Sequence, residues 1–325
     1  MRLLPKRRAA SPQVEDGKAE RPEPSTEEPE LDGWLATFYG ERLAALDAAC
    51  ARSGPEAFAR FRGLDDDLWA LLLSRRYTAY PNIRALMPEV PEAHLQLTWN
   101  GAQGLALLAQ SVGFYAHVKA MMDRHGAKPL ADSRVLDFGV GWGRLIRFFA
   151  RDVETGALMG VDPAPEILEV CHRSRVPAVL ARSEFLPETL PFGEIDLAYS
   201  FSVFTHVSEA AAAACIDALH EAIVPGGLLV LTIRPPAYLE LDPRMADALE
   251  SLGDPVAAMQ EPRYVFVPHP AENAHPQYDG GEMTYGEAVM SLAYVRERWG
   301  DRFEVLGAKV AVDDIYQVAV TLKRR

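Results

Sequence analysis

Val135-Leu-Asp-Phe-Gly-Val-Gly-Trp-Gly-Arg144 joins a short apolar segment to an apolar helical pattern through three glycines at alternate positions. This order predicts a strand, a tight turn and the start of a helix. Glycine suits such a turn because its backbone reaches angles that a side chain forbids, and because a ligand can then lie almost against the main chain. The motif favours a nucleoside-binding loop, and the surrounding sequence has to support that interpretation.

The composition is that of an ordinary globular protein. The chain has 325 residues, of which 49% are hydrophobic and 24% charged, enough for one large domain with additions or for two domains. Its net charge of -13 argues against nucleic-acid binding as the main role and favours a small substrate. No apolar run is long enough to span a membrane, so we expect a cytoplasmic protein.

The three cysteines, Cys50, Cys171 and Cys215, are far apart and lack the spacing of metal ligands. Neither a disulfide framework nor a metal site is therefore expected.

The part of the chain before the glycine motif divides into two regions. Residues 1–30 combine Pro, Glu, Lys and Arg with almost no apolar residues, which predicts a disordered tail without a secretion signal. Residues 31–126 show apolar residues at helical spacing and form a predicted helical N-terminal region. Within it, the segment around Gln96, Trp99 and Asn100 could fold over a ligand as a lid, or serve as a surface linker with one packed tryptophan.

From Ser133 onward, predicted strands and helices alternate. The expected strands begin at Val135 and continue with residues 157–161, 178–180, 195–200 and 228–233. Alternation of this kind predicts an α/β fold with a parallel sheet and right-handed crossovers. The fifth strand is wholly apolar, as buried parallel strands are.

Ligands of such sheets bind at the carboxyl ends of the strands, so the residues that follow each strand are candidates for the site. Asp162 ends the second strand and is well placed to accept hydrogen bonds from ribose hydroxyls. The third strand is followed by Ser183, Glu184 and Phe185, and the fourth by Phe201, Ser202, Thr205 and His206. This distribution favours a cofactor that carries a nucleoside.

Two nucleoside cofactors compete for the arrangement. The dinucleotide pattern GxGxxG requires its third glycine where this chain has Arg144. Asp137 lies just ahead of the glycines, where an acid would repel a pyrophosphate but complement a cationic amino group. S-adenosylmethionine carries such a group.

The region from Ser133 to about Ile233 resembles the class I S-adenosylmethionine-dependent methyltransferases. The resemblance rests on the glycine motif, on Gly160-Val-Asp162, on Leu190-Pro-Phe192 and on Val224-Pro-Gly-Gly-Leu228. It implies a Rossmann-like, mostly parallel seven-stranded sheet with helices on both faces, completed by a helix over 284–299 and by an antiparallel strand pair over 303–306 and 316–322. The expected domain covers residues 127–325, with an insertion at about 234–283.

The resemblance also implies which residues bind the cofactor. Asp137 and the backbone of Gly139, Gly141 and Gly143 would hold the methionine portion, and Asp162 the ribose. Glu184 and Phe185 would lie on the adenine side, with Ser183 and Phe201 at the neighbouring strand ends. The third strand departs from the family pattern, since many relatives place an Asp and a small residue where this chain has Arg182-Ser-Glu-Phe185.

The acceptor side is less defined. His206 follows the fourth strand directly and is the best-placed base for a hydroxyl acceptor, ahead of His269 and His275 in the insertion. A structural hydrogen-bonding role for His206 is the alternative. Arg234 lies at the end of the fifth predicted strand, where we expect its side chain to be exposed to solvent. The alternative is that it binds an acidic acceptor.

We therefore predict a methyltransferase that transfers a methyl group from S-adenosylmethionine to a hydroxyl or amine of a small molecule by direct displacement. One alternative is a module that binds the cofactor without turnover. A nicotinamide-dependent oxidoreductase is the other, but its Tyr-x-x-x-Lys pair would be Tyr115 and Lys119, which precede the first strand.

Overall fold

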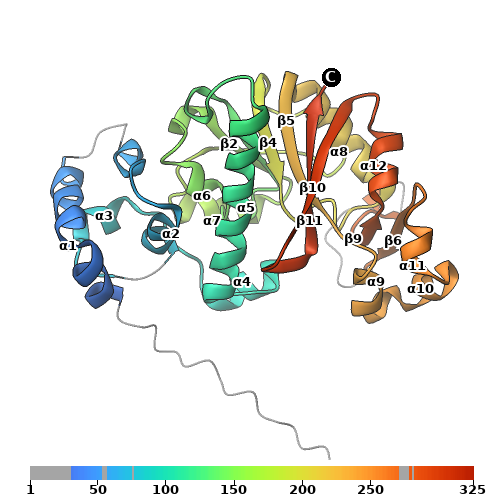
Figure 1. Ribbon diagram of the computed structural model, residues 1–325, viewed down its shortest axis with the longest axis horizontal. Coiled ribbons are helices and arrows are strands. Elements are labelled where there is room, and N and C mark those ends of the chain that lie inside the picture. The colour runs from blue at the N-terminus through green and yellow to red at the C-terminus, as the bar shows by residue number, and fades with distance from the viewer. Residues whose placement is uncertain (1–30, 53–56, 75–76, 271–277, 280–281) are drawn as a thin grey trace, which may run out of the picture.

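The computed structural model describes residues 31–52, 57–74, 77–270, 278–279 and 282–325 (Figure 1). The tail predicted for residues 1–30 lies outside this range. The α-helices of the described residues are α1 (Leu31–Cys50), α2 (Asp66–Ser74), α3 (Pro81–Leu86), α4 (Ala93–Asn100), α5 (Gly104–His125), α6 (Ile146–Phe149), α7 (Pro165–Arg173), α8 (Glu209–Ala222), α9 (Tyr238–Leu241), α10 (Ala246–Leu252), α11 (Pro255–Ala258) and α12 (Leu292–Arg298). The strands are β1 (Val135–Phe138), β2 (Leu158–Asp162), β3 (Val179–Arg182), β4 (Ile195–Ser200), β5 (Ile223–Ile233), β6 (Tyr264–Pro268), β7 (Tyr278–Asp279), β8 (Glu282–Met283), β9 (Gly286–Met290), β10 (Phe303–Ala311) and β11 (Asp314–Arg324).

The described residues form a central seven-stranded sheet in the order β10-β11-β5-β4-β1-β2-β3. The pairs among β1 to β5 are parallel, and β11 runs antiparallel to both β5 and β10. The order reverses between β1 and β4, which is where an open α/β sheet forms its ligand crevice. The predicted fold class, with its antiparallel strand pair and helical N-terminal region, is confirmed.

Two hydrophobic cores cover the two faces of the sheet, because successive strand residues point to opposite sides. In β5, Leu228 and Val230 pack into the core under α5, α6 and α7. Their neighbours Leu229 and Leu231 pack into the core under α8 and α12. Strands buried on both faces therefore read as continuous apolar runs in the sequence.

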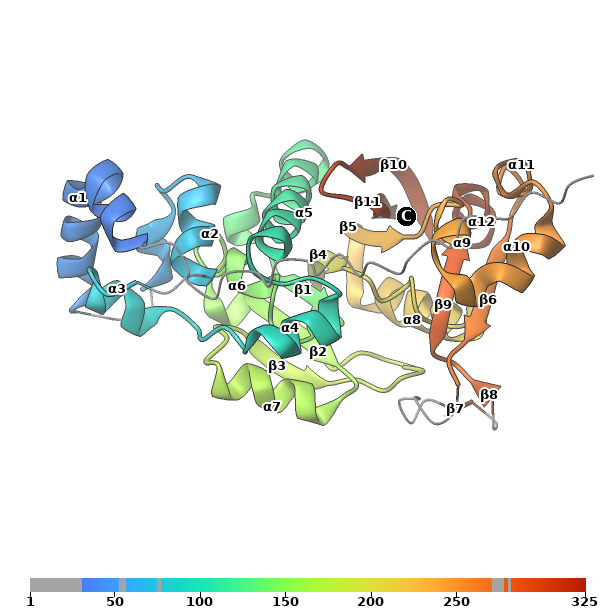
Figure 2. The same ribbon diagram turned by 90° about the horizontal axis from the view of Figure 1, so that it is seen from below.

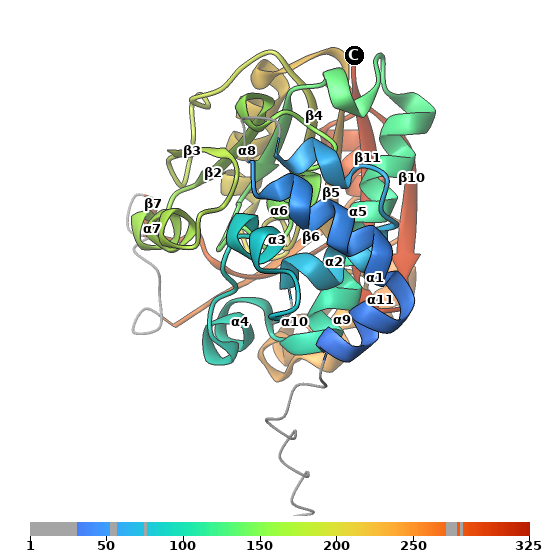
Figure 3. The same ribbon diagram turned by 90° about the vertical axis from the view of Figure 1, so that its left-hand side faces the viewer.

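The N-terminal helices extend the first of these cores. Figure 3 shows α1, α2 and α3 at the end of the molecule where α6 lies. The fully buried Trp69 of α2 donates a hydrogen bond from its indole Nε1 to the Phe148 carbonyl at 2.9 Å. The guanidinium of Arg151, also buried, donates to the Leu64 carbonyl at 2.9 Å and pairs with Asp66. The helical region is thus tied to the helix that follows the glycine motif.

The segment after β5 forms a small layer of its own at the other end of the molecule (Figure 2). Helices α9, α10 and α11 lead into β6, which pairs antiparallel with β9. The helix predicted for residues 284–299 is wrong in its first half, because residues 286–290 form β9 and α12 begins only at Leu292. All five residues of β9 are buried, so this strand lacks the apolar and polar alternation that would have distinguished it from a helix.

Within the described residues, no helix is both long and apolar enough to cross a membrane.

Candidate cofactor site at the strand ends

The glycine motif forms a loop in which all three glycines have left-handed backbone angles. The φ angles are +80° at Gly139, +53° at Gly141 and +80° at Gly143. A β-carbon on Gly139 would collide with Val203, and one on Gly143 would approach Val176 to 2.6 Å. A β-carbon on Gly141 would meet no described atom within 4 Å. The loop therefore packs tightly on both sides and leaves open space above its middle glycine.

Asp162 connects this loop to the next helix. Its Oδ2 accepts a hydrogen bond from the Gly141 amide at 3.0 Å, and its Oδ1 accepts one from the Ala164 amide at 3.0 Å. Burial raises the pKa of Asp162 to about 6. Each carboxylate oxygen can accept a second hydrogen bond, so the side chain retains acceptor capacity toward a ligand on the loop.

Asp137 lies at the end of β1 and is 2% exposed. Its Oδ2 has no hydrogen-bond partner among the described residues. Burial raises the pKa of this carboxyl well above its usual range, and the neighbouring Tyr199 and Arg144 act in the opposite direction. The buried hydroxyl of Tyr199 interacts with this carboxyl, and like Oδ2 it has no partner within hydrogen-bond geometry among the described residues. The two groups together leave buried hydrogen-bonding capacity that a ligand could use.

The remaining residues predicted for the cofactor site lie at the ends of β3 and β4. Ser183 is buried and donates its amide to the Asp162 carbonyl at 3.2 Å, whereas Glu184 is exposed and Phe185 half-buried. Phe201 lies on the other side of the crevice, edge-to-face against Phe114 of α5 at 4.9 Å between ring centroids. The structure thus brings Asp137, the glycine loop, Asp162 and Ser183 together, and it separates Phe201 from the residues that follow β3.

Helix α4 contacts the glycine loop directly (Figure 2). Asn100, its last residue, accepts a hydrogen bond at 2.7 Å from the indole Nε1 of Trp142 in the loop. The guanidinium of Arg147 lies over the indole ring of Trp142, 4.7 Å from the ring centroid. This contact holds the end of α4 at the loop, and the predicted lid and the predicted surface linker both stay predictions.

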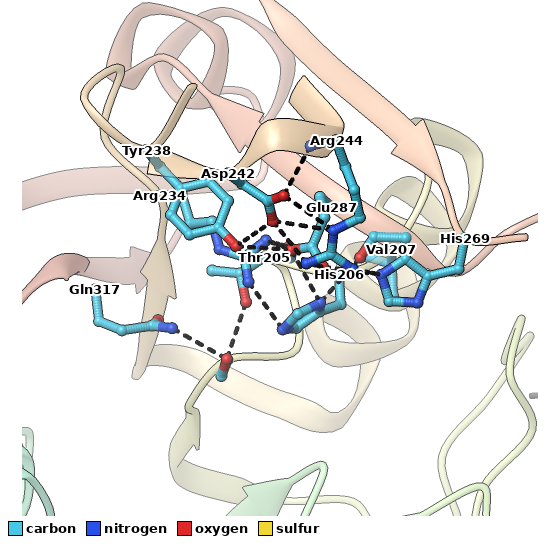
Figure 4. Close-up of polar contacts among 12 residues, drawn as sticks. Thr205, His206, Val207, Arg234, Tyr238, Asp242, Arg244, His269, Glu287 and Gln317 are labelled. Carbon is cyan, nitrogen blue, oxygen red and sulfur yellow. Dashed lines mark hydrogen bonds and ion pairs between the residues drawn. The ribbon is translucent and has the colours of Figure 1, made fainter. Parts of the chain in front are cut away.

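A second polar group, which we call the Glu287 cluster, lies beyond the ends of β4 and β5 (Figure 4). It consists of His206, Arg234, Tyr238, Arg244, His269 and Glu287. The carboxylate of Glu287 is buried at the centre, where it pairs with Arg234, with Arg244 at 2.7 Å and with His269 at 2.8 Å. Burial acts to raise the pKa of Glu287, but the surrounding cationic groups outweigh it and lower the pKa below its usual value.

Both ring nitrogens of His206 are engaged in this cluster. Nδ1 lies 2.9 Å from the Gly286 carbonyl, which can only accept, so Nδ1 carries the proton. Nε2 then accepts from Arg234 Nη2 at 3.0 Å. Burial, together with Arg234, lowers the pKa of His206 to about 4. In this arrangement the imidazole is neutral and has no free lone pair.

Arg234 and Glu287 were not predicted in these roles. Arg234 is 5% exposed and donates to the Thr205 carbonyl at 2.6 Å, so the expectation of a solvated arginine is wrong. Glu287 lay inside the predicted helix. The signal that could have found it is an acid within the apolar run Gly286-Glu-Ala-Val-Met290, where a buried charge requires a partner. His275, the third candidate base, lies outside the described residues.

Comparison with known families supports the assignment. Residues 135–227 match the model of a methyltransferase domain, and they contain the glycine loop, Asp162 and β4. These residues form a class I S-adenosylmethionine-dependent methyltransferase domain. The chain therefore contains a methyltransferase domain.

The chain is also similar to solved structures, three of which are described as methyltransferases. An S-adenosylmethionine-dependent methyltransferase from Mesorhizobium loti aligns over 65% of this chain and 98% of its own, with 16% identity and a TM-score of 0.41. One from Clostridium acetobutylicum aligns over 71% and 97%, with 12% identity and a TM-score of 0.47. The magnesium protoporphyrin IX methyltransferase of Synechocystis aligns over 74% and 92%, with 16% identity and a TM-score of 0.43. No curated protein matches the sequence of the chain.

Two features of the methyltransferase domain fit the cofactor. The unpartnered Oδ2 of Asp137 can accept from the ammonium of the methionine portion. The open space over Gly141 leaves the backbone of the loop accessible to a ligand.

Proposed function

We propose that this protein transfers the methyl group of S-adenosylmethionine to a hydroxyl or amine of a small-molecule acceptor by direct displacement. The observation that carries the proposal is the buried, unpartnered Asp137 oxygen at the mouth of a glycine loop with open space above it. In this proposal Asp137 binds the ammonium, the glycine loop supports the methionine portion, and Asp162 binds the ribose. Glu184 and Phe185, past the end of β3, border the adenine.

When bound, the cofactor supplies a methyl group on a positively charged sulfur, which an acceptor lone pair can attack as the carbon–sulfur bond breaks. The protein then has to align the acceptor and exclude water. Proximity and orientation can supply roughly 7 to 11 kcal/mol of the barrier. In this proposal helix α4, joined to the loop through Asn100, covers one side of the site.

The Glu287 cluster supports a non-basic role for His206. A proton could enter Nε2 only if the Arg234 contact broke, and burial beside that arginine opposes the imidazolium. We therefore propose that His206 shapes the acceptor side rather than removing a proton. An amine acceptor in its neutral form needs no base, because its lone pair is already free.

The acceptor is proposed to be a small molecule that reaches the site between α4 and the segment after β5. The net charge of -13 disfavours a polyanion, and both elements lie beside the carboxyl ends of the strands, where acceptor-recognising residues are expected.

The test is methyl transfer from radiolabelled S-adenosylmethionine to panels of hydroxyl and amine acceptors, with Asp137→Ala as the inactive control. Transfer by the wild type to members of either panel supports the proposal. Tight cofactor binding without transfer to any acceptor would favour the alternative, a module that binds the cofactor without turnover.

A further inference from the structure

Strand β6 forms the outer edge of the small layer that follows β5. It pairs with β9 in a two-stranded sheet, and within the described residues no other strand pairs with it. Both ribbon views place β6 on the side of β9 that faces away from the central sheet (Figures 1 and 2). The inner edge of β9 is occupied, because the Gly286 amide donates to the His206 carbonyl at 2.8 Å. The layer is therefore closed by the chain itself on one side and ends at β6 on the other.

The hydrogen bonds between β6 and β9 show which backbone groups of β6 are left for a further strand. Before the first residue of β6, the Arg263 carbonyl accepts from the Ser291 amide at 3.0 Å. After its last residue, the His269 amide donates to the Tyr285 carbonyl at 3.0 Å. The direction of these groups alternates along an antiparallel strand, so the odd-numbered residues of β6 direct their amides and carbonyls toward β9. The even-numbered residues direct theirs outward.

Tyr264 and Phe266 carry the outward amides and carbonyls, and no feature of the strand protects them. Residues 264–267 include no charge and no proline, and their side chains are only half-buried. The ladder with β9 runs from Tyr264 to Pro268 without a bulge. Charges, prolines and bulges are the features with which proteins ordinarily protect a sheet edge. The edge of β6 is therefore a template for another extended strand.

The two outward residues are spaced so that a second copy of β6 fits them. When two copies run antiparallel about a two-fold axis beside Val265, Tyr264 of each copy lies opposite Phe266 of the other. Each of these two pairs can exchange two N–H···O hydrogen bonds. The aromatic rings then form cross-strand pairs, which are favourable. In the same register Arg263 lies opposite Val267, so no like charges face each other.

The surface beside this edge is balanced in charge. A groove of about 300 Å³ lies between the start of β6, α12 and the start of α8. Its charged residues are all exposed and are Arg263, Arg298, Glu209 and Glu297. Because the whole chain carries a net charge of -13, two copies can associate only where the surface is locally neutral. Two charges of each sign meet this condition and allow a second copy to oppose unlike groups, whereas a strongly charged partner would be repelled by one pair.

We propose that β6 pairs with β6 of a second copy of this chain, which forms a symmetric dimer with a four-stranded sheet in the order β9-β6-β6-β9. A two-fold interface requires a surface that is complementary to itself, and the register and charges of this edge meet that requirement. The proposal does not depend on methyl transfer. An extended segment of a different protein, or water alone, is the competing occupant of the edge.

Sedimentation equilibrium of the full chain measures the association. The wild type should follow a monomer–dimer equilibrium at concentrations between about 1 and 100 μM. Phe266→Lys should raise the dissociation constant of the dimer about tenfold or more, because it places two charges on the paired edges. Phe38→Lys is the matched control, since Phe38 is 72% exposed on α1 at the opposite end of the molecule. It should keep the wild-type dissociation constant.

Val265→Cys tests the register and does not require Phe266→Lys to fold. In the dimer the two β-carbons at this position face each other about 4.5 to 5.5 Å apart, within reach of a disulfide. The native cysteines Cys50, Cys171 and Cys215 are buried. Oxidised glutathione should therefore convert most of Val265→Cys into a disulfide-linked dimer, and Phe38→Cys should stay mostly monomeric.

Two results would overturn the proposal. One is a wild type that stays monomeric over the whole concentration range, which would leave the edge to a different protein or to water. The other is a wild-type dimer that Phe266→Lys does not weaken and in which Val265→Cys forms no cross-link, because the copies would then meet at another surface.

Discussion

The proposed role of Asp162 in binding the ribose predicts that cofactor affinity depends on pH. Burial raises its pKa to about 6, and only the ionised carboxylate can accept from both ribose hydroxyls while keeping its two backbone hydrogen bonds. Cofactor affinity should therefore be constant above pH 7 and fall as pH drops through 6, by about tenfold at pH 5. Calorimetry across this range measures the effect. Asp162→Asn should bind weakly throughout and lose the step near pH 6, and a flat wild-type profile would exclude this role for Asp162.

Substitution of Gly141 tests whether the bound cofactor occupies the open space above the loop. Alanine at φ +53° costs about 1 to 2 kcal/mol of backbone strain, and the added methyl would occupy the open space. Gly141→Ala should lower cofactor affinity by tenfold or more.

The control is Gly253→Ala, at φ +70° after α10, where a β-carbon also meets no described atom within 4 Å. Because its ψ is −90°, outside the left-handed helical region, the substitution should cost at least as much stability as Gly141→Ala and leave cofactor affinity unchanged. Equal affinities for the two variants would show that the ligand does not lie over Gly141.

The loop residues could be predicted because they are contiguous in the sequence and because their backbone angles demand glycine. The Glu287 cluster could not, since Arg234 and Glu287 are separated by 53 positions and neither spacing nor periodicity joins them.

Among the elements, β9 contains one residue of a buried ion pair. Glu287 of β9 pairs with Arg234 at the end of β5, and both side chains are buried. Glu287→Gln leaves the Arg234 charge without its counter-ion and should lower the free energy of unfolding by about 3 to 5 kcal/mol. Urea denaturation measures this loss. Glu250→Gln, an exposed position on α10, should change it by less than about 0.5 kcal/mol, and a loss below about 1 kcal/mol for Glu287→Gln would contradict the role of the pair.

Strands β1, β2, β4 and β5 could be predicted because their buried apolar runs end in turn residues or an acid. Strand β9 could not, because burial of both faces removes the alternation that distinguishes a strand from a helix. Its neighbour β6 lies in the segment that was predicted only as an insertion.

At the scale of the whole molecule, the helical N-terminal region and the methyltransferase domain share one hydrophobic core. Leu35 and Leu43 of α1 belong to the same buried cluster as Val135 and Leu228 of the sheet. Residues 31–126 should therefore be required for a folded methyltransferase domain.

Removal of residues 1–30 tests the predicted tail. Because these residues have too few apolar side chains to contribute to a core, the shortened protein should keep its melting temperature within about 2 °C and its methyl transfer activity unchanged. Thermal denaturation and the radiolabel assay measure both. A large loss of either would show that this segment is ordered and contributes to the folded protein.

The central claim is that the Asp137 carboxylate and the glycine loop form an S-adenosylmethionine site. Calorimetric titration of wild-type protein and Asp137→Ala with S-adenosylmethionine, at pH 7.5 or thereabouts, tests it most directly. We predict saturable binding by the wild type and none measurable in the variant, which circular dichroism should show to be folded. Near-normal affinity in a folded Asp137→Ala variant would contradict the account.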